Sequence, residues 1–332
     1  MVADQEHAPT PPDAAPPDPE GAPPPRSSGR TLVIQFFLLP ALIVAACIGV
    51  FVLFGALVQE RRTPREVLAE IRSGREDQRW HAAFELSKML DDAESVRRDG
   101  GFGAELMRAF EAERDASDPR VRRFLALSLG KLGDPKPADL LARSLDDRDS
   151  DTRLYVLLAL GAIGGARHAR AVLPQLGSDD PGMRKAAAYV LGNLGNRSAA
   201  AALRAALHDP VLEVRWNSAL ALLRLKDRAG LGLGLRMLKR DYVSRAPGIT
   251  ANQVEQTLAA AAATLGGFGA SQARPGLQEL RDRDPSPAVR EAAHKALERL
   301  APAGESTVSA ARRTRRRPGS ARWPARPADF LT

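Results

Sequence analysis

Asp118-Pro-Arg-Val-Arg-Arg-Phe-Leu-Ala-Leu-Ser-Leu-Gly-Lys-Leu-Gly133 is the stretch that decides the fold, because its pattern returns at a fixed interval. Similar stretches begin at Asp149 and Asp180, and a shorter one surrounds Arg215. The arginine of the pattern recurs every 31 residues, as Arg122, Arg153, Arg184 and Arg215. A fixed period of this length is typical of stacked supersecondary units and not of one globular core.

One unit, residues 118–145, contains the signals of two helices. Asp118 can cap the first helix, and Pro119 suits its first position. Apolar residues then recur at helical spacing until Gly133 ends the helix. Residues 138–145 form a second amphipathic helix. Because neither helix can bury its apolar face alone, neighbouring units must stack.

The pattern D-x-x-V-R-x-x-A-A-x-A-L-G-x-L-G resembles HEAT repeats, in the short form of phycobilin-lyase-like HEAT proteins. The resemblance covers about residues 75–302, with a degenerate first repeat at Gly74–Leu90 and a last repeat at Asp284–Leu297. It implies an all-α, right-handed α-solenoid of about six to seven helix pairs. Between repeats, we expect a turn at Gly100-Gly-Phe-Gly103 and a loop near Lys239–Thr250, where the spacing grows to 43 residues between Arg215 and Leu258.

Composition divides the chain into five segments. Residues 1–30 hold nine prolines and residues 303–332 are rich in arginine, so we predict disorder for both tails. Residues 31–59 carry no charge in 29 positions, which is long enough for one transmembrane helix. A linker helix over residues 60–73 precedes the solenoid, residues 74–302.

The arginines around residues 31–59 predict how the chain sits in a bacterial inner membrane. Two lie on the N-terminal side, and five follow on the C-terminal side, namely Arg61, Arg62, Arg65, Arg72 and Arg75. The positive-inside rule therefore favours a single-pass protein with a cytoplasmic solenoid. A periplasmic solenoid is the alternative.

The recurring arginines invite comparison with a phosphate-binding row, but a structural ladder is the stronger interpretation. In HEAT proteins this arginine pairs with acids of adjacent turns. Here Asp118, Asp149 and Asp180 each lie one helical turn before an arginine, so we expect them as local partners.

In HEAT solenoids the helix carrying the motif lines the concave face, where partners bind. Positions one, two and five after the motif arginine fall on one stripe of that helix. They are unusually rich in aromatic residues for a chain with 5% aromatics. Aromatic and Arg anchors are typical of interfaces. The predicted partner-binding residues are Trp80, Phe84, Arg123, Phe124, Tyr155, Lys185, Tyr189, Trp216 and Asn217. The alternative is that these rings fill gaps between alanine-rich helices.

We expect no enzyme, no cofactor and no metal site. None of the five histidines is followed by Glu, and none has metal-ligand spacing. The leading hypothesis is a membrane-anchored scaffold that binds a protein partner, and we expect neither nucleic acid nor a small molecule as the main partner. The first alternative is a lyase-like protein that handles a hydrophobic prosthetic group. The second is binding of nucleic acid or anionic lipid by a basic tail, which comprises Arg312, Arg313, Arg315, Arg316 and Arg317.

Overall fold

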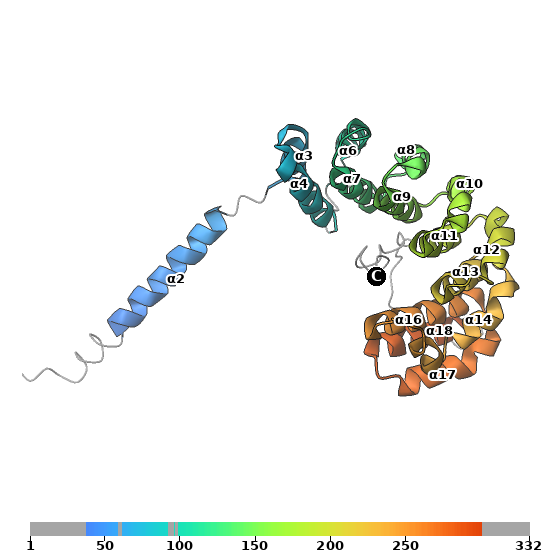
Figure 1. Cartoon of the computed structure of the whole chain (residues 1–332). Coiled ribbons are helices and arrows are strands. Elements are labelled where there is room, and N and C mark those ends of the chain that lie inside the picture. Colours follow the sequence, from blue (N-terminus) through green and yellow to red (C-terminus); the bar gives the residue numbers. More distant parts are fainter. Residues whose placement is uncertain (1–37, 59–61, 92–95, 97–98, 301–332) are drawn as a thin grey trace, which may run out of the picture. The chain divides into compact units, whose positions relative to one another are not determined.

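The computed structural model describes residues 38–58, 62–91, 96 and 99–300 (Figure 1). The chain divides into two units, residues 1–61 and 62–332, and each is described by itself. Three parts of the predicted organisation lie outside the described residues: the Pro-rich segment 1–30, residues 31–37 and 59 of the predicted transmembrane span, and the basic tail with Arg312–Arg317.

The first unit contains one described helix, α2 (Leu39–Val58), which falls inside the predicted span 31–59. The side chains of residues 41–51 are all exposed, and Phe51 is 80% exposed. Within the part of the chain that the structure describes, no helix combines the length and the apolar character that a membrane crossing requires.

The second unit is a two-layered stack of helices, and its described residues contain no strand. One layer consists of the helices with the repeated motif, here called the motif helices, and each packs against the next. They are α4 (Glu76–Met89), α7 (Pro119–Leu132), α9 (Ser150–Ile163), α11 (Pro181–Leu194), α13 (Leu212–Arg224), α16 (Ala251–Phe268) and α18 (Pro287–Leu300).

The second layer is built from shorter helices, several of which begin or end in a 3₁₀ turn. Its α-helices are α3 (Pro64–Ser73), α6 (Gly100–Ala112), α8 (Ala138–Arg143), α10 (Ala169–Val172), α12 (Ala200–Ala206), α14 (Leu231–Arg236) and α17 (Arg274–Arg283). The 3₁₀ turns are η2 (Ser144–Asp146), η3 (Ala166–His168), η4 (Leu173–Gly177), η5 (Arg197–Ala199), η6 (Arg228–Gly230) and η7 (Ser271–Ala273).

The packed helix pair is offset from the repeat that the sequence suggests. Helix α8 follows α7 in the chain, yet it packs mainly on α9, and α12 likewise packs on α13. Each of these second-layer helices therefore joins the motif helix that comes after it. The stack is an all-helical solenoid, as the sequence predicted.

The starts and ends of the motif helices follow from a few residues. Asp118, Asp149 and Asp180 are N-caps whose carboxylates accept hydrogen bonds from backbone N–H groups at 2.9, 2.7 and 2.8 Å. Gly133 and Gly195 end α7 and α11 with φ of 69° and 73°, a left-handed conformation that favours glycine. These caps agree with the predicted helix boundaries.

Small residues let the motif helices approach one another closely. A Cβ added to Gly192 of α11 would lie 2.7 Å from the Cα of Ala221 in α13. A Cβ added to Gly266 of α16 would lie 2.7 Å from the Cα of Ala296 in α18. The glycine of the L-G-x-L-G pattern therefore has a packing role at these crossings, as well as any role in ending the helix.

Two expectations about local structure were wrong. Gly100-Gly-Phe-Gly103 is not a turn but the first turn of α6, because the Asp99 carboxylate accepts the Gly101 N–H at 3.0 Å and Phe102 is buried. The segment Lys239–Thr250 is not wholly a loop. It contains α15 (Arg240–Ser244), which is held by the fully buried Val243.

Helix α3 occupies the predicted linker over residues 60–73, and it belongs to the packed stack. It begins with a capping box in which Thr63 and Glu66 satisfy each other's backbone N–H groups. Its apolar residues Val67, Leu68 and Ile71 are buried against α4 and α6. The solenoid core therefore extends to α3.

Candidate partner-binding face and pocket

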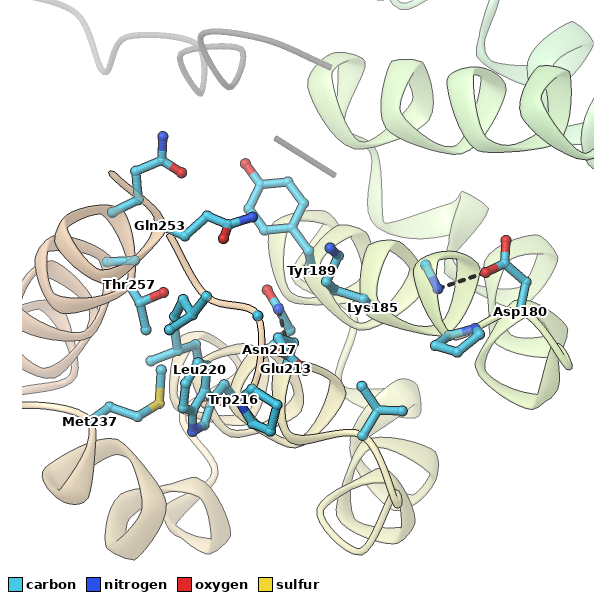
Figure 2. A pocket seen from close by; sticks show the side chains of 18 of the residues that line it. Asp180, Lys185, Tyr189, Glu213, Trp216, Asn217, Leu220, Met237, Gln253 and Thr257 are labelled. Atoms are coloured by element: carbon cyan, nitrogen blue, oxygen red, sulfur yellow. Dashed lines mark hydrogen bonds between the residues drawn. The ribbon is translucent and has the colours of Figure 1, made fainter. Parts of the chain in front are cut away.

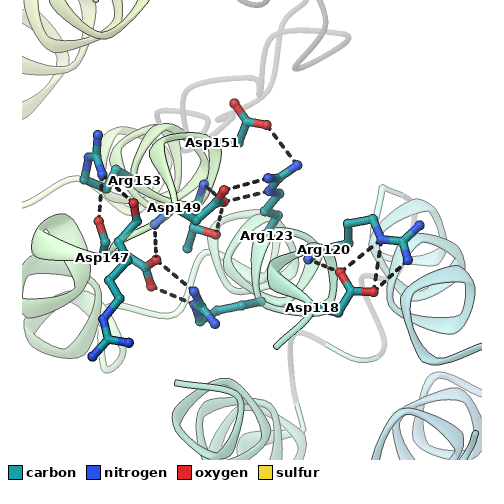
Figure 3. A network of polar contacts seen from close by, with 10 residues as sticks. Asp118, Arg120, Arg123, Asp147, Asp149, Asp151 and Arg153 are labelled. Atoms are coloured by element: carbon teal, nitrogen blue, oxygen red, sulfur yellow. Dashed lines mark hydrogen bonds and ion pairs between the residues drawn. The ribbon is translucent and has the colours of Figure 1, made fainter. Parts of the chain in front are cut away.

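The motif arginines make contacts between neighbouring units, as Arg122 shows. Its guanidinium donates to both carboxylate oxygens of Asp147 at 2.6 and 2.8 Å, and to the carbonyl oxygen of Glu113 at 2.7 Å. The carbonyl oxygen of the same Asp147 accepts a hydrogen bond from Arg153 of the next motif helix at 2.7 Å (Figure 3). One aspartate thus connects two motif arginines.

This arrangement, in which one aspartate joins the arginines of two successive motif helices and which is called the relay below, recurs along the stack. Arg184 donates to Asp209 at 2.8 and 3.1 Å, and the carbonyl oxygen of Asp209 accepts from Arg215 at 3.2 Å. The predicted partners were wrong: Asp118, Asp149 and Asp180 are N-caps, while the acid that pairs with Arg122 or Arg184 lies 25 residues after it. The reason is geometric, because that acid sits in the loop just before the next motif helix.

An aromatic row crosses the first motif helices. The ring of Phe84 in α4 meets Phe124 in α7 edge-on, with centroids 5.1 Å apart. Phe124 in turn meets Tyr155 in α9 edge-on at 6.0 Å. Phe84 is 38% exposed, and the other two rings are partly buried. These three predicted residues, called the aromatic row below, therefore contact one another across three helices and still reach the surface.

Charged groups flank the aromatic row. Arg123 donates to both oxygens of Asp149 at 2.7 Å and lies 2.8 Å from Asp151 (Figure 3). Burial opposes the ionisation of Asp149, but hydrogen bonds from Arg123 and Thr152 outweigh it and hold the pKa of this carboxyl well below its usual range. Burial also raises the pKa of the Tyr155 phenol. Arg123 is thus already neutralised by two acids.

Trp80 lies one turn before Phe84 on α4. Its ring centroid is 3.5 Å from that of His81, and the guanidinium of Arg120 stands over it at 4.6 Å. Trp80 is partly buried, so it presents one more aromatic surface on α4, with a cation beside it.

A cavity of about 810 Å³ is lined in part by the other four predicted residues, which are Lys185, Tyr189, Trp216 and Asn217. Figure 2 shows Tyr189 and Lys185 on one side, Gln253 and Thr257 of α16 on the other, and Trp216 and Leu220 between them. Leu220, the fifth residue after Arg215, also lies on the predicted stripe. The sequence did not point to most of the remaining lining, which includes Glu213, Arg224, Met237, Pro247, Gly248, Ile249, Gln253, Gln256 and Thr257.

The pocket exists where the repeat is interrupted. From Arg215 to Leu258 the spacing is 43 residues instead of 31, and the extra chain forms α15 and the following loop. Pro247, Gly248 and Ile249 of that loop line the pocket, and Gly248 turns the backbone with a φ of 74°. The lengthened spacing was the sequence signal that could have located this site.

Trp216 forms part of the pocket wall and is almost completely buried, at 3% exposure. Its indole N–H donates to the hydroxyl of Tyr242 in α15 at 3.3 Å, and the two rings meet edge-on at 6.0 Å. For Trp216, the alternative interpretation of a ring that fills a gap between helices describes the position well.

Two cations reach the pocket. Burial lowers the pKa of Lys185, and this effect is opposed by nearby Glu213 and Asp180. Burial also lowers the pKa of Arg224, whose guanidinium lies over the Tyr189 ring at 5.5 Å. Among the described residues, no carboxylate pairs with Arg224. Because Arg224 lies nine residues after Arg215, it falls outside the predicted stripe.

The described residues contain no group of three or more His, Cys, Asp or Glu side chains that could hold a metal ion. The aromatic row and the pocket offer packing by aromatic rings, amide and hydroxyl hydrogen bonds, and cationic groups.

The repeats are matched by known proteins. The family model for HEAT repeats matches residues 106–176 and 169–241, and no curated protein matches the chain. The complex of CpcE and CpcF of phycocyanin lyase from Nostoc sp. PCC7120 is 21% identical. It covers 73% of this chain and 96% of its own, with a TM-score of 0.50. The archaeal HEAT-like repeats protein from Thermococcus onnurineus NA1 is 15% identical, covering 73% and 98%, with a TM-score of 0.37.

A designed armadillo repeat protein in complex with the peptide (KR)4 is 14% identical, covering 72% of this chain and 99% of its own, with a TM-score of 0.39. At such identities the likeness concerns the fold alone. The family match over residues 106–241, together with the stacked helices, supports a HEAT-repeat protein.

Proposed function

We propose that this protein is an adaptor that binds a protein partner on the exposed surface of its motif helices. The observation that carries the proposal is the aromatic row of Phe84, Phe124 and Tyr155, which crosses three helices and remains at the surface. Rigid aromatic side chains give large contact areas at a low entropic cost, and they dominate interface energetics. The proposed role is binding and not catalysis.

Site-specific photocrosslinking in cells tests this proposal. We would replace Phe84 by benzoylphenylalanine, which keeps an aromatic ring at that position, and place the same group at exposed Arg108 of α6 as the control. We expect a discrete adduct from position 84 and none from position 108. Adding Phe124→Ala and Tyr155→Ala should abolish the adduct without changing the circular dichroism spectrum. Absence of any adduct at position 84, or the same adducts at both positions, would contradict the proposal.

The adaptor is further proposed to be held at a membrane by residues 31–59, with the solenoid in the cytoplasm. The support is the absence of charge from this stretch of sequence and the exposure of its apolar side chains, including Ile48, Val50 and Phe51, between 57% and 80%. Apolar side chains that protein does not cover need another apolar environment. Membrane attachment would raise the local concentration of the bound partner.

Cell fractionation tests the attachment. The full chain should resist extraction from membranes with alkaline carbonate, whereas a variant with Ile48→Lys and Val50→Lys should be released, because charges are costly in the bilayer centre. Separate fusions of alkaline phosphatase and of green fluorescent protein after Leu300 then report on which side of the membrane the solenoid lies. Fluorescence without phosphatase activity is the expected result. Recovery of the unaltered chain in the soluble fraction would contradict attachment.

A further inference from the structure

Arg224 is held differently from three other arginines that are buried or partly buried. Arg122, Arg184 and Arg240 each donate two hydrogen bonds to one aspartate, at 2.6 to 3.1 Å. Arg224 is also partly buried, yet within the described residues the contact recorded for its guanidinium is the face of Tyr189. A partly desolvated cation without a carboxylate partner is costly to keep, so it often marks a site where an anion binds.

The surroundings of Arg224 suit a small ligand. The pocket holds about 810 Å³, within the range of roughly 300–1,000 Å³ typical of small-molecule sites. Apolar side chains such as Leu220 and Ile249 line it together with polar groups, which include Asn217 and the carboxylates of Asp180 and Glu213. Apolar walls with a few convergent polar groups are the usual composition of such sites.

One wall of the pocket is a specific addition to the repeat. It is formed by Pro247, Gly248 and Ile249 in the loop after α15, within the stretch that interrupts an otherwise regular spacing of 31 residues. Val243 and Ala246 anchor this insertion in the core, at 0% and 5% exposure, and Tyr242 fixes Trp216 by a hydrogen bond. Insertions in repeat proteins frequently form binding surfaces.

We propose that this pocket binds a small amphipathic anion, a carboxylate carried on an apolar body, and that Arg224 pairs with the carboxylate. The apolar body would lie against Leu220, Met237 and Ile249. This site is separate from the aromatic row on α4, α7 and α9, so it is a second binding function and does not depend on the proposed protein partner.

Calorimetric titration of the full chain in a non-ionic detergent tests the pocket with two matched probes. The anion is 2-naphthoate, and its neutral counterpart is 2-naphthamide, which has the same ring system. Each is also titrated into detergent alone, to subtract partitioning. We expect saturable binding of naphthoate to one site, at least tenfold tighter than naphthamide, because hydrogen bonds to charged groups are the stronger kind.

Variants then identify the residue. Arg224→Met should weaken naphthoate at least tenfold and leave naphthamide unchanged, which shows that the pocket itself is intact. Arg224→Lys should retain part of the preference. Arg236→Met, an exposed arginine that stands over Tyr242 outside the pocket, should bind both probes like the unaltered chain.

Two results would overturn the proposal. One is equal binding, or no saturable binding, of naphthoate and naphthamide by the unaltered protein, a measurement that needs no variant to fold. The other is an Arg224→Met variant, folded by circular dichroism, that keeps the full preference for the anion.

Discussion

Asp147→Ala should loosen the contact between α7 and α9 more than any change to a surface charge. The side chains of Arg122 and Asp147 are only 6% and 8% exposed, and two hydrogen bonds join them. Removing the carboxylate leaves a buried guanidinium whose remaining acceptor is the Glu113 carbonyl. Breaking a buried pair in this way costs about 3–5 kcal/mol. Asp147→Asn keeps an oxygen acceptor, so it should cost less.

Hydrogen exchange is the suitable assay, because solenoids open locally and a single unfolding midpoint averages over units. A loss of about 3–5 kcal/mol corresponds to exchange that is roughly 10² to 10⁴ times faster, limited by the stability of the unit itself. Peptides from α7 and α9 should show this change, while peptides from α17 and α18 should not.

The exposed pair of Arg281 and Asp282 provides the control, since Asp282→Ala should leave exchange unchanged throughout. If Asp147→Ala alters exchange no more than Asp282→Ala does, the relay carries little free energy, and apolar packing alone holds the repeats together.

Further predictions concern the later part of the solenoid. Because the hydrogen bond from Arg184 lowers the pKa of Asp209, the unfolded chain binds more protons as the pH falls. The free energy that this pair adds is complete above the usual carboxyl pKa and is lost as the pH falls through the lowered pKa of Asp209. Between pH 7 and pH 3, the free energy of urea unfolding should therefore fall less in Asp209→Asn than in the unaltered protein. Gly192→Ala should destabilise the protein by about 1–3 kcal/mol, because the added Cβ would meet Ala221. Gly232→Ala should instead stabilise it by up to about 1 kcal/mol, because a Cβ there meets nothing within 4 Å. Thermal unfolding of both variants measures the two changes.

Features that depend on neighbouring residues were predictable from the sequence. The 31-residue period predicted the stacked helices, and α7 begins after Asp118 and ends at Gly133 as expected. The start of α6 was missed because a run of glycines has low helix propensity, whereas the Asp99 cap and the burial of Phe102 outweigh it. Local signals therefore located most helices but misjudged one whose stability comes from tertiary packing.

Contacts between units were harder to predict. Arg122 and Asp147 are 25 residues apart, and nothing in either neighbourhood indicates that they meet. The stripe of positions after each motif arginine did lead to Tyr189 and Trp216, but the pocket also needs Arg224 and a wall from an insertion that the period does not describe. Sites at an interruption of a repeat lie outside what the repeat can predict.

The relay of arginines and aspartates has a mechanical consequence. At the position of Asp147 and Asp209, the intervening repeat has Ser178, and within the described residues Arg153 donates only to the carbonyl oxygens of Asp147 and Arg148. The joint between α9 and α11 therefore lacks the carboxylate clasp that stiffens the joints on either side. Bending of the solenoid should therefore be easier at this joint than at the joints on either side, and the joint lies between the segment with the aromatic row and the segment with the pocket.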